Sequence, residues 1–96
     1  MNKAVNMKLV NVGYGNLVNA FMVVSVVHAD SAPARRMAQK AKEEGMIIDA
    51  TQGRKTQSLL IMENGSVVLS ALLPETLSFR IHFMLSARKH LQDVQD

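Results

Sequence analysis

Residues 58–70 read Ser-Leu-Leu-Ile-Met-Glu-Asn-Gly-Ser-Val-Val-Leu-Ser, and this stretch carries the strongest signal for the fold. Two mainly aliphatic runs, 58–62 and 66–70, flank the dipeptide Asn64-Gly65. Aliphatic and β-branched side chains favour strands, and Asn-Gly suits the positive φ angles at the centre of a type I′ turn. We therefore predict an antiparallel β-hairpin with a type I′ turn at Asn64-Gly65.

Three further strands are expected before this hairpin. Residues 7–12 alternate polar and apolar side chains and lead into Gly-Tyr-Gly at 13–15, which predicts a strand ending in a turn. Valines dominate 17–27, so we expect a second strand there, long and mostly buried. A short apolar run at 46–50 predicts another strand, and the polar, basic residues 51–56 predict a loop after it.

A helix is expected between the second and third of these strands. Asp30 or Ser31 can cap its first turn, and Gly45 can supply the left-handed residue that ends it. The apolar residues that follow helical spacing are Ala34, Met37, Ala38 and Ala41. Arg35 and Arg36 fall outside this stripe, so one face should pack while the other is basic.

A second helix is expected over 74–91, because Pro74 suits a first helical turn and Glu75 complements the positive end of the helix dipole. Its main apolar face comprises Leu77, Ile81, Met84, Leu85 and Leu91, with Arg88 on the same face. Phe79 and Phe83 form a second apolar strip, which fits either a subunit interface or a thicker monomer core. The order of elements predicts an α+β fold, with a small, mainly antiparallel sheet and two helices.

The composition indicates one folded domain over residues 1–96, with an ordered core at about 7–91 and a loose tail at 92–96. The absence of cysteine excludes disulfides, thiolate metal sites and cysteine nucleophiles. The N-terminus lacks the apolar run of a signal peptide, and the longest apolar stretch, 20–27, is too short to span a bilayer. We therefore expect a cytoplasmic protein with no membrane partner.

Catalytic equipment is not visible in the sequence. Gly53-Arg54-Lys55-Thr56 is similar to part of a phosphate-binding P-loop, but Ile48 stands where the first glycine belongs and a strand follows instead of a helix. The three histidines are scattered, and no serine has a nearby His and Asp pattern. We expect no enzyme activity, catalytic residue, metal, cofactor or small-molecule substrate.

The basic turn at 53–56 is the best candidate for binding. Arg54 can form two parallel hydrogen bonds with a DNA phosphate. Lys55 can add a point charge, and Thr56 can donate a hydrogen bond from its hydroxyl to a phosphate oxygen. Arg35 and Arg36 are possible helpers, although charges there oppose the helix dipole. The alternative is a solvated basic turn without a partner. Few cations per chain give weak affinity, so DNA binding here requires many copies acting together.

The Gly-Tyr-Gly turn has a weaker functional signal. It lacks the third glycine and the following helix of a dinucleotide-binding fingerprint, so we interpret it as a turn. Tyr14 could stack on a sugar or a base, whereas packing on its own sheet is the commoner role of a tyrosine.

Four blocks of the chain together resemble the RemA-like family of bacterial extracellular-matrix gene regulators. They are Asn-Val-Gly-Tyr-Gly-Asn at 11–16, Asp-Ser-Ala-Pro-Ala-Arg-Arg-Met at 30–37, Gly-Met-Ile-Ile-Asp-Ala-Thr at 45–51 with Gly-Arg-Lys-Thr at 53–56, and Leu-Ser-Ala at 69–71 with Pro-Glu-Thr at 74–76. The resemblance extends over nearly the whole ordered chain.

The resemblance implies a DNA-binding transcriptional regulator of matrix and biofilm genes that acts on the nucleoid. It also implies a homo-oligomeric ring, with an octamer expected, whose basic outer edge is followed by double-stranded DNA. The family's arginine pair corresponds to Arg54 and Lys55. The lysine keeps the positive charge but cannot form the bidentate hydrogen bonds of a guanidinium. Met22 stands where the family pattern has a DNA-binding arginine, which predicts weaker DNA binding. The alternative function is an oligomeric scaffold that binds protein or RNA through excess apolar surface at Phe21, Met22 and the two helical phenylalanines.

Overall fold

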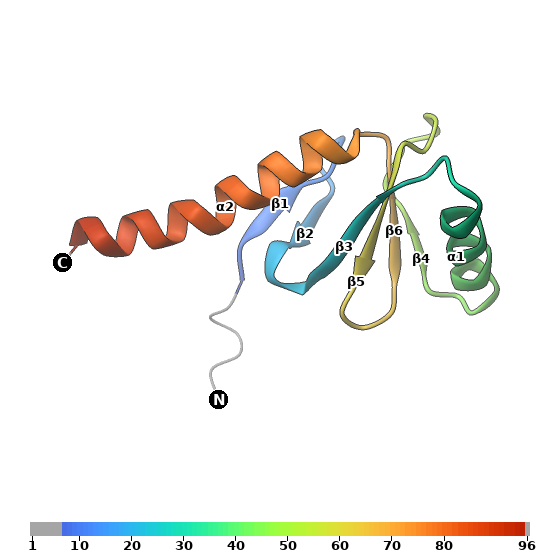
Figure 1. The fold of residues 1–96 in the computed structure, drawn as a ribbon, viewed down its shortest axis with the longest axis horizontal. Helices are drawn as coiled ribbons and strands as arrows, with labels where there is room; N and C mark the ends of the chain where they lie inside the picture. The colour runs from blue at the N-terminus through green and yellow to red at the C-terminus, as the bar shows by residue number, and fades with distance from the viewer. Residues whose placement is uncertain (1–6, 96) are drawn as a thin grey trace.

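The computed structural model describes residues 7–95, with side chains described through residue 86 (Figure 1). The elements are β1 (Leu9–Asn11), β2 (Leu17–Asn19), the 3-10 helix η2 (Ala20–Met22), β3 (Val23–His28), α1 (Ala32–Glu43), β4 (Ile47–Asp49), β5 (Ser58–Met62), β6 (Val67–Ser70) and α2 (Pro74–Gln95). The predicted α+β fold with two helices is confirmed within this part of the chain. The expected roles of Arg88 and Leu91 fall outside the described side chains, and the core limits and the loose tail stay predictions.

The strands form two sheets where one was expected. The larger sheet has the order β3-β5-β6-β4, in which β4 runs parallel to β6 and the other pairs are antiparallel. β1 and β2 form a separate antiparallel pair. Successive side chains of a strand point to opposite faces, so Leu59 packs toward α1 while Leu60 packs toward α2 and the β1–β2 pair. The larger sheet is thus covered on both faces (Figure 1).

The single long strand predicted over 17–27 is wrong, because η2 breaks it into β2 and β3. The Asn19 side chain accepts hydrogen bonds from the backbone N–H groups of Phe21 and Lys8, at 3.1 and 3.2 Å. These side-chain bonds compete with a continuous strand ladder and turn the chain from one sheet into the other. β3 is also an edge strand, and its residues are half-buried or exposed rather than mostly buried.

The hairpin predicted at 58–70 is confirmed, but the type I′ turn predicted for it is wrong. Of its two central residues only Gly65 has positive φ, at 91°, whereas a type I′ turn requires both. Gly65 N–H donates to the Met62 carbonyl at 3.0 Å, and Met62 N–H donates to the Ser66 carbonyl at 2.9 Å. This pattern is a three-residue loop, a type I turn followed by a glycine bulge. The Asn64 side chain instead accepts from Ser66 N–H at 3.0 Å.

Helix α1 begins and ends where its capping residues predict. The Ser31 hydroxyl accepts from Ala34 N–H at 3.1 Å, which satisfies one of the free donors of the first turn. At the other end Gly45 has φ of 70°, and the next residue, Met46, donates its N–H to the Ala41 carbonyl at 2.8 Å. This is a Schellman ending. Ala34 and Ala41 are buried, but Met37, expected on the packed face, is exposed.

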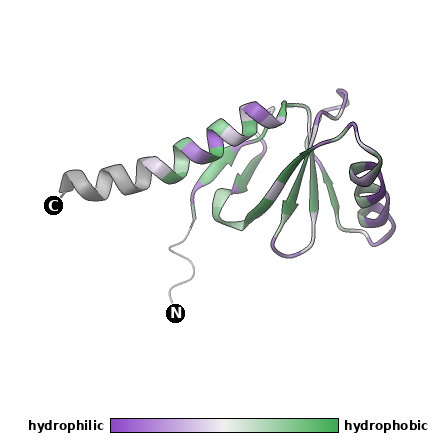
Figure 2. Cartoon of the chain, in the orientation of Figure 1, coloured by the Kyte–Doolittle hydropathy of each residue, from purple (hydrophilic) through white to green (hydrophobic). Residues whose placement is uncertain are grey.

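Helix α2 presents two different apolar faces. Leu77 is fully buried, and Ile81, Met84 and Leu85 pack against the same core, as predicted. Phe79 and Phe83 are 70% and 60% exposed, which makes the alternative of a thicker monomer core wrong for this strip. Figure 2 shows hydrophobic residues concentrated in the strands, with hydrophilic residues on the outer side of α1. None of the helices in the described part of the chain is long and apolar enough to cross a bilayer.

Candidate nucleic-acid interface

Two tight turns of the same type lie near the start of α2. In the first, Asn16 N–H donates to the Gly13 carbonyl at 3.0 Å, and the central residues Tyr14 and Gly15 have φ of 54° and 79°. Two positive φ angles between the ends of such a bond are typical of a type I′ turn. The glycine that follows Tyr14 adopts the left-handed conformation without steric cost.

The second turn lies in the β4–β5 loop. Arg54 N–H donates to the Thr51 carbonyl at 3.0 Å, and the central residues Gln52 and Gly53 have φ of 53° and 78°. The type I′ geometry predicted for the hairpin therefore occurs in this loop, where the pair is Gln-Gly. We call residues 13–16 and 51–56 together the two-turn surface.

The two turns are held side by side. The Asn16 side-chain amide donates to the Gly13 carbonyl at 2.8 Å within its own turn and to the Ala50 carbonyl at 3.4 Å beside the other. Gly13 has φ of 121°, and a Cβ there would lie 3.6 Å from the Leu72 side chain. Glycine therefore suits both the backbone conformation and the close packing at this position. One amide thus joins segments that are 34 residues apart in the sequence.

The base of the second turn is fixed by Asp49. Its carboxylate accepts from the Thr51 hydroxyl at 2.6 Å and from Thr51 N–H at 2.9 Å. These bonds, the side-chain bond first, lower the pKa of the Asp49 carboxyl below its ordinary value. Thr51 is buried, so its hydroxyl requires this acceptor. The sequence reasoning missed this pair, although Asp followed two residues later by Thr is a recognisable signal for such a turn.

The two turns also meet through their side chains. The Arg54 guanidinium carbon lies 5.5 Å from the centroid of the Tyr14 ring, within the range of a cation–π interaction. Tyr14 remains 49% exposed, so it does not pack into its own sheet as a buried residue would. Sequence spacing gave no sign of this contact, because the two residues belong to loops that follow different strands.

The other predicted contact residues are less closely associated. Lys55 is exposed beside Arg54, and Thr56 is partly buried. Arg35 and Arg36 are exposed near the start of α1. The start of this helix lies at the same end of the larger sheet as the β4–β5 loop (Figure 1). Among the described residues, no hydrogen bond or ring contact links these two arginines to the two-turn surface.

Met22 lies at the opposite end of the larger sheet. Its carbonyl accepts from Glu63 N–H at 2.8 Å, in the loop of the β5–β6 hairpin. The β3–β5 register pairs Val23 with Met62 at this end and His28 with Ser58 at the end near the second turn. A change at Met22 therefore leaves the charge of the two-turn surface within the same subunit intact.

An apolar patch lies on the outer side of α2. The Phe79 and Phe83 rings stack with centroids 6.5 Å apart and an interplanar angle of 20°. Leu9 and Leu17 of the β1–β2 pair line the same hollow and are also exposed. We call these four residues the Phe patch. Phe21, expected to share this apolar surface, is partly buried.

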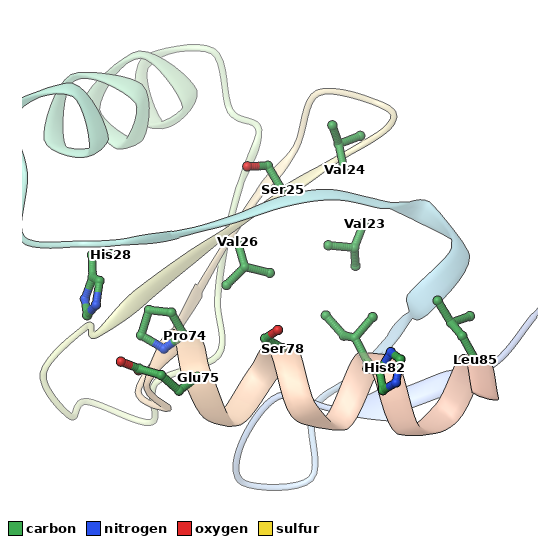
Figure 3. Close-up of a pocket in the computed structure, with 11 residues that line it drawn as sticks. Val23, Val24, Ser25, Val26, His28, Pro74, Glu75, Ser78, His82 and Leu85 are labelled. Atoms are coloured by element: carbon green, nitrogen blue, oxygen red, sulfur yellow. The ribbon is translucent and has the colours of Figure 1, made fainter. Parts of the chain in front are cut away.

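A separate groove runs between β3 and α2 (Figure 3). It is lined in part by apolar side chains such as Val26 and Ile81. His28 and Glu75 lie at one end, and His82 lies toward the other, so these polar groups do not converge (Figure 3). In the described part of the chain, no three His, Asp or Glu residues are grouped closely enough to hold a metal ion.

The fold and the site define a small α+β domain that carries two cross-braced turns with exposed basic side chains. The chain matches the model of the RemA-like family, described as extracellular matrix regulatory protein A-like, over residues 9–81, and it belongs to this family. The resemblance noted in the sequence is confirmed.

Its relatives carry names that agree with this assignment. The chain is 42% identical to the extracellular matrix regulatory protein A of Bacillus subtilis over 86 residues, which are 90% of this chain and 92% of that protein. It is 51% identical to a presumed regulatory protein of Lachnoclostridium phytofermentans over 75 residues, 78% of this chain and 82% of the relative. A presumed regulatory protein of Caldicellulosiruptor saccharolyticus is 46% identical over 81 residues, 84% of this chain and 80% of the relative.

Proposed function

We propose that this chain is a DNA-binding transcriptional regulator that grips the phosphate backbone with the two-turn surface. The observation that carries the proposal is that Arg54 and Lys55 are exposed on a turn whose base is fixed by Asp49. Exposed cations on a fixed backbone suit phosphate oxygens, because little freedom is lost on binding. Such contacts position a protein on DNA without reading its sequence. In this role the chain is a binding protein and not an enzyme, and it needs no cofactor.

Family membership supports a class of target genes for this proposal. The name of the Bacillus subtilis relative supports extracellular matrix genes, and hence biofilm formation, as the regulated class. The regulator would act in the cytoplasm on the nucleoid, where double-stranded DNA is its partner. With Met22 in place of the family's arginine, the two-turn surface carries the DNA contact, with Arg35 and Arg36 as helpers at the same end.

Self-association is part of the proposal, because the few cations of one subunit give weak binding. The affinity for DNA rises with the number of phosphates that are contacted at the same time. Several copies on a ring would therefore bind DNA more tightly than one subunit does. A ring requires two different, complementary surfaces on each subunit. The Phe patch and the groove between β3 and α2 are two different apolar surfaces, and we assign them these two roles. A closed homo-oligomer, with an octamer expected from the family, would repeat the two-turn surface around one edge.

The test is a DNA titration of paired charge variants. The double variant Arg54→Ala with Lys55→Ala should abolish binding to a fluorescently labelled duplex while the oligomer stays intact by light scattering. A matched control is Lys40→Ala with Lys42→Ala, because both lysines are exposed near the end of α1, away from the two-turn surface (Figure 1). This control removes the same charge and should keep most of the affinity. Equal losses in both double variants would show a diffuse charge effect and contradict the assigned surface.

A second candidate function is an oligomeric scaffold for protein or RNA. The exposure of Phe79 and Phe83 favours it, because large apolar side chains on a surface mark an interaction site. Salt separates the two functions. Binding to DNA phosphates weakens steeply between low and physiological salt, whereas partner binding through the phenylalanines would be nearly insensitive to salt.

A further inference from the structure

Tyr14 occupies a backbone conformation that its residue type disfavours. Among the described non-glycine residues, only Tyr14 and Gln52 have positive φ, and each takes the first central position of one of the two turns. Asn, Asp and Gly are preferred at that position, because a bulky side chain crowds the backbone in the left-handed region. Backbone strain of this kind persists where it serves a site and is stabilised by its surroundings.

Burial does not offset this strain. The Tyr14 side chain is half exposed, and a Cβ placed at the neighbouring Gly15 would meet nothing within 4 Å, so this corner of the turn is open. The Tyr14 ring instead contacts the Arg54 guanidinium, at 5.5 Å. The contact with Arg54 therefore explains why an aromatic residue stands at this position.

We propose that Tyr14 is a positioning residue that holds the Arg54 guanidinium ready for a DNA phosphate. This inference rests on the proposed function and adds a residue from a second segment of the chain to its phosphate contact. A guanidinium that lies over a ring face keeps its N–H groups free, because they point outward in its own plane. Those groups can then form the forked pair of hydrogen bonds that arginine makes with phosphate.

The ring can position the arginine because the two turns are hydrogen-bonded to one another. The Asn16 amide bonds to the Ala50 carbonyl, and Thr51 is held by Asp49, so both backbones belong to one braced unit. An arginine side chain restricted in advance loses less rotamer freedom when a phosphate binds. The effect is repeated in every subunit of an oligomer.

The experiment compares Tyr14→Phe, Tyr14→Leu and Tyr14→Asn in DNA titrations at several salt concentrations. An exposed cation–π contact corresponds to a change of about two- to fivefold per site, so Tyr14→Leu and Tyr14→Asn should weaken binding by at least that factor. Tyr14→Phe keeps the ring face and should restore most of the lost affinity. The slope of log affinity against log salt concentration should stay unchanged, because these substitutions remove no charge.

Stability distinguishes positioning from a structural role. Asn tolerates positive φ, so Tyr14→Asn should unfold at a higher urea concentration than the wild type while binding DNA more weakly. If it binds more weakly but is also less stable or loses the oligomer, Tyr14 is a structural residue and the inference is wrong. Wild-type affinity in Tyr14→Asn would contradict it equally.

Coupling to Arg54 gives an independent check. In an Arg54→Ala background, Tyr14→Leu should cause no further loss, because the ring acts through the arginine. Additive losses would show that Tyr14 acts by another route. A wild-type protein that binds no duplex, or whose binding is unaffected by Arg54→Ala with Lys55→Ala, refutes the proposed function itself. Failure of Tyr14 alone leaves that function standing.

Discussion

Ser70 donates its hydroxyl to the carbonyl oxygen of Val12 at 2.7 Å, and this buried hydrogen bond ties the larger sheet to the end of the β1–β2 pair. The residues are 58 positions apart in the sequence. The Ser70 hydroxyl also accepts from Leu72 N–H at 3.0 Å, so the same side chain fixes the turn that follows β6. Because Val12 directly precedes the turn that carries Tyr14, this bond helps to set the position of the two-turn surface.

Ser70→Ala should lower the free energy of unfolding by about 1–3 kcal/mol, because the buried Val12 carbonyl would lose its partner. Urea unfolding followed by circular dichroism measures this change. Ser78→Ala, at an exposed position of α2, is the matched control and should change stability by less than about 0.5 kcal/mol. A Ser70→Ala protein as stable as the control would show that the bond between the sheets contributes nothing.

Gly53→Ala should destabilise the second turn. The glycine has φ of 78°, and a Cβ placed there would meet nothing within 4 Å, so the cost is one of backbone conformation rather than of space. An L-residue in this region costs about 1–2 kcal/mol. Gly53→Asn should recover much of the loss, because asparagine tolerates the left-handed region. Thermal unfolding of the three proteins tests this order, and equal effects of Ala and Asn would contradict it.

The double substitution Phe79→Ser with Phe83→Ser should dissociate the proposed oligomer and leave the subunit folded. Both rings are largely exposed in the subunit, so little core packing is removed. Light scattering should report a smaller particle, and DNA affinity should fall because multiplicity is lost. Leu77→Ala is the contrasting control: this fully buried residue should cost about 2–5 kcal/mol of stability. If the double serine variant forms the same oligomer as the wild type, the Phe patch is not part of the subunit interface.

Asp49 should make the stability of the protein depend on pH in the acid range. Its bonds to Thr51 lower the pKa of the carboxyl in the folded state below the unfolded value, near 3.8. The carboxylate therefore stabilises the fold above that value, and this contribution is lost as the pH falls through the lower, folded pKa. Urea unfolding should show that wild type is more stable than Asp49→Asn at pH 7. The difference in unfolding free energy should narrow as the pH falls below 3.8. Asp30→Asn, at an exposed position, serves as the comparison.

Arg35→Ala with Arg36→Ala should weaken DNA binding less than the loss of Arg54 and Lys55. The two helical arginines are exposed at the same end of the sheet but are not braced against the two turns (Figure 1). In a plot of log affinity against log salt concentration, each phosphate contact that is lost should make the slope shallower by about one. The helix itself should become slightly more stable, because positive charge near its start is unfavourable. An unchanged slope and affinity would show that these arginines are solvated surface residues.

Several parts of the fold could be predicted because their causes are local. Ser31 and Gly45 cap and end α1 through bonds within a few residues, and capping patterns are visible in a sequence. The hairpin at 58–70 was predictable for the same reason. Its turn type was not, because the Asn64 side chain competes with the backbone for Ser66 N–H, and composition alone does not rank these options.

The site was predictable only in part. The basic pair Arg54 and Lys55 and its exposure follow from a polar loop between strands. The contact between Tyr14 and Arg54 could not be predicted, since nothing in the spacing of residues 40 positions apart shows that their turns are adjacent. The break at Asn19 was missed because valine-rich composition favours a strand on either side of it.

Local sequence was sufficient for the α+β class, the ends of the first helix, the hairpin and the charge of the basic loop, since these depend on short-range hydrogen bonding and on side-chain periodicity. Three features emerged only from the folded chain: β1 and β2 form their own sheet, Phe79 and Phe83 face outward, and Arg54 lies over Tyr14. These features depend on which distant segments share one core, and that choice is made by packing over the whole chain rather than by any local stretch.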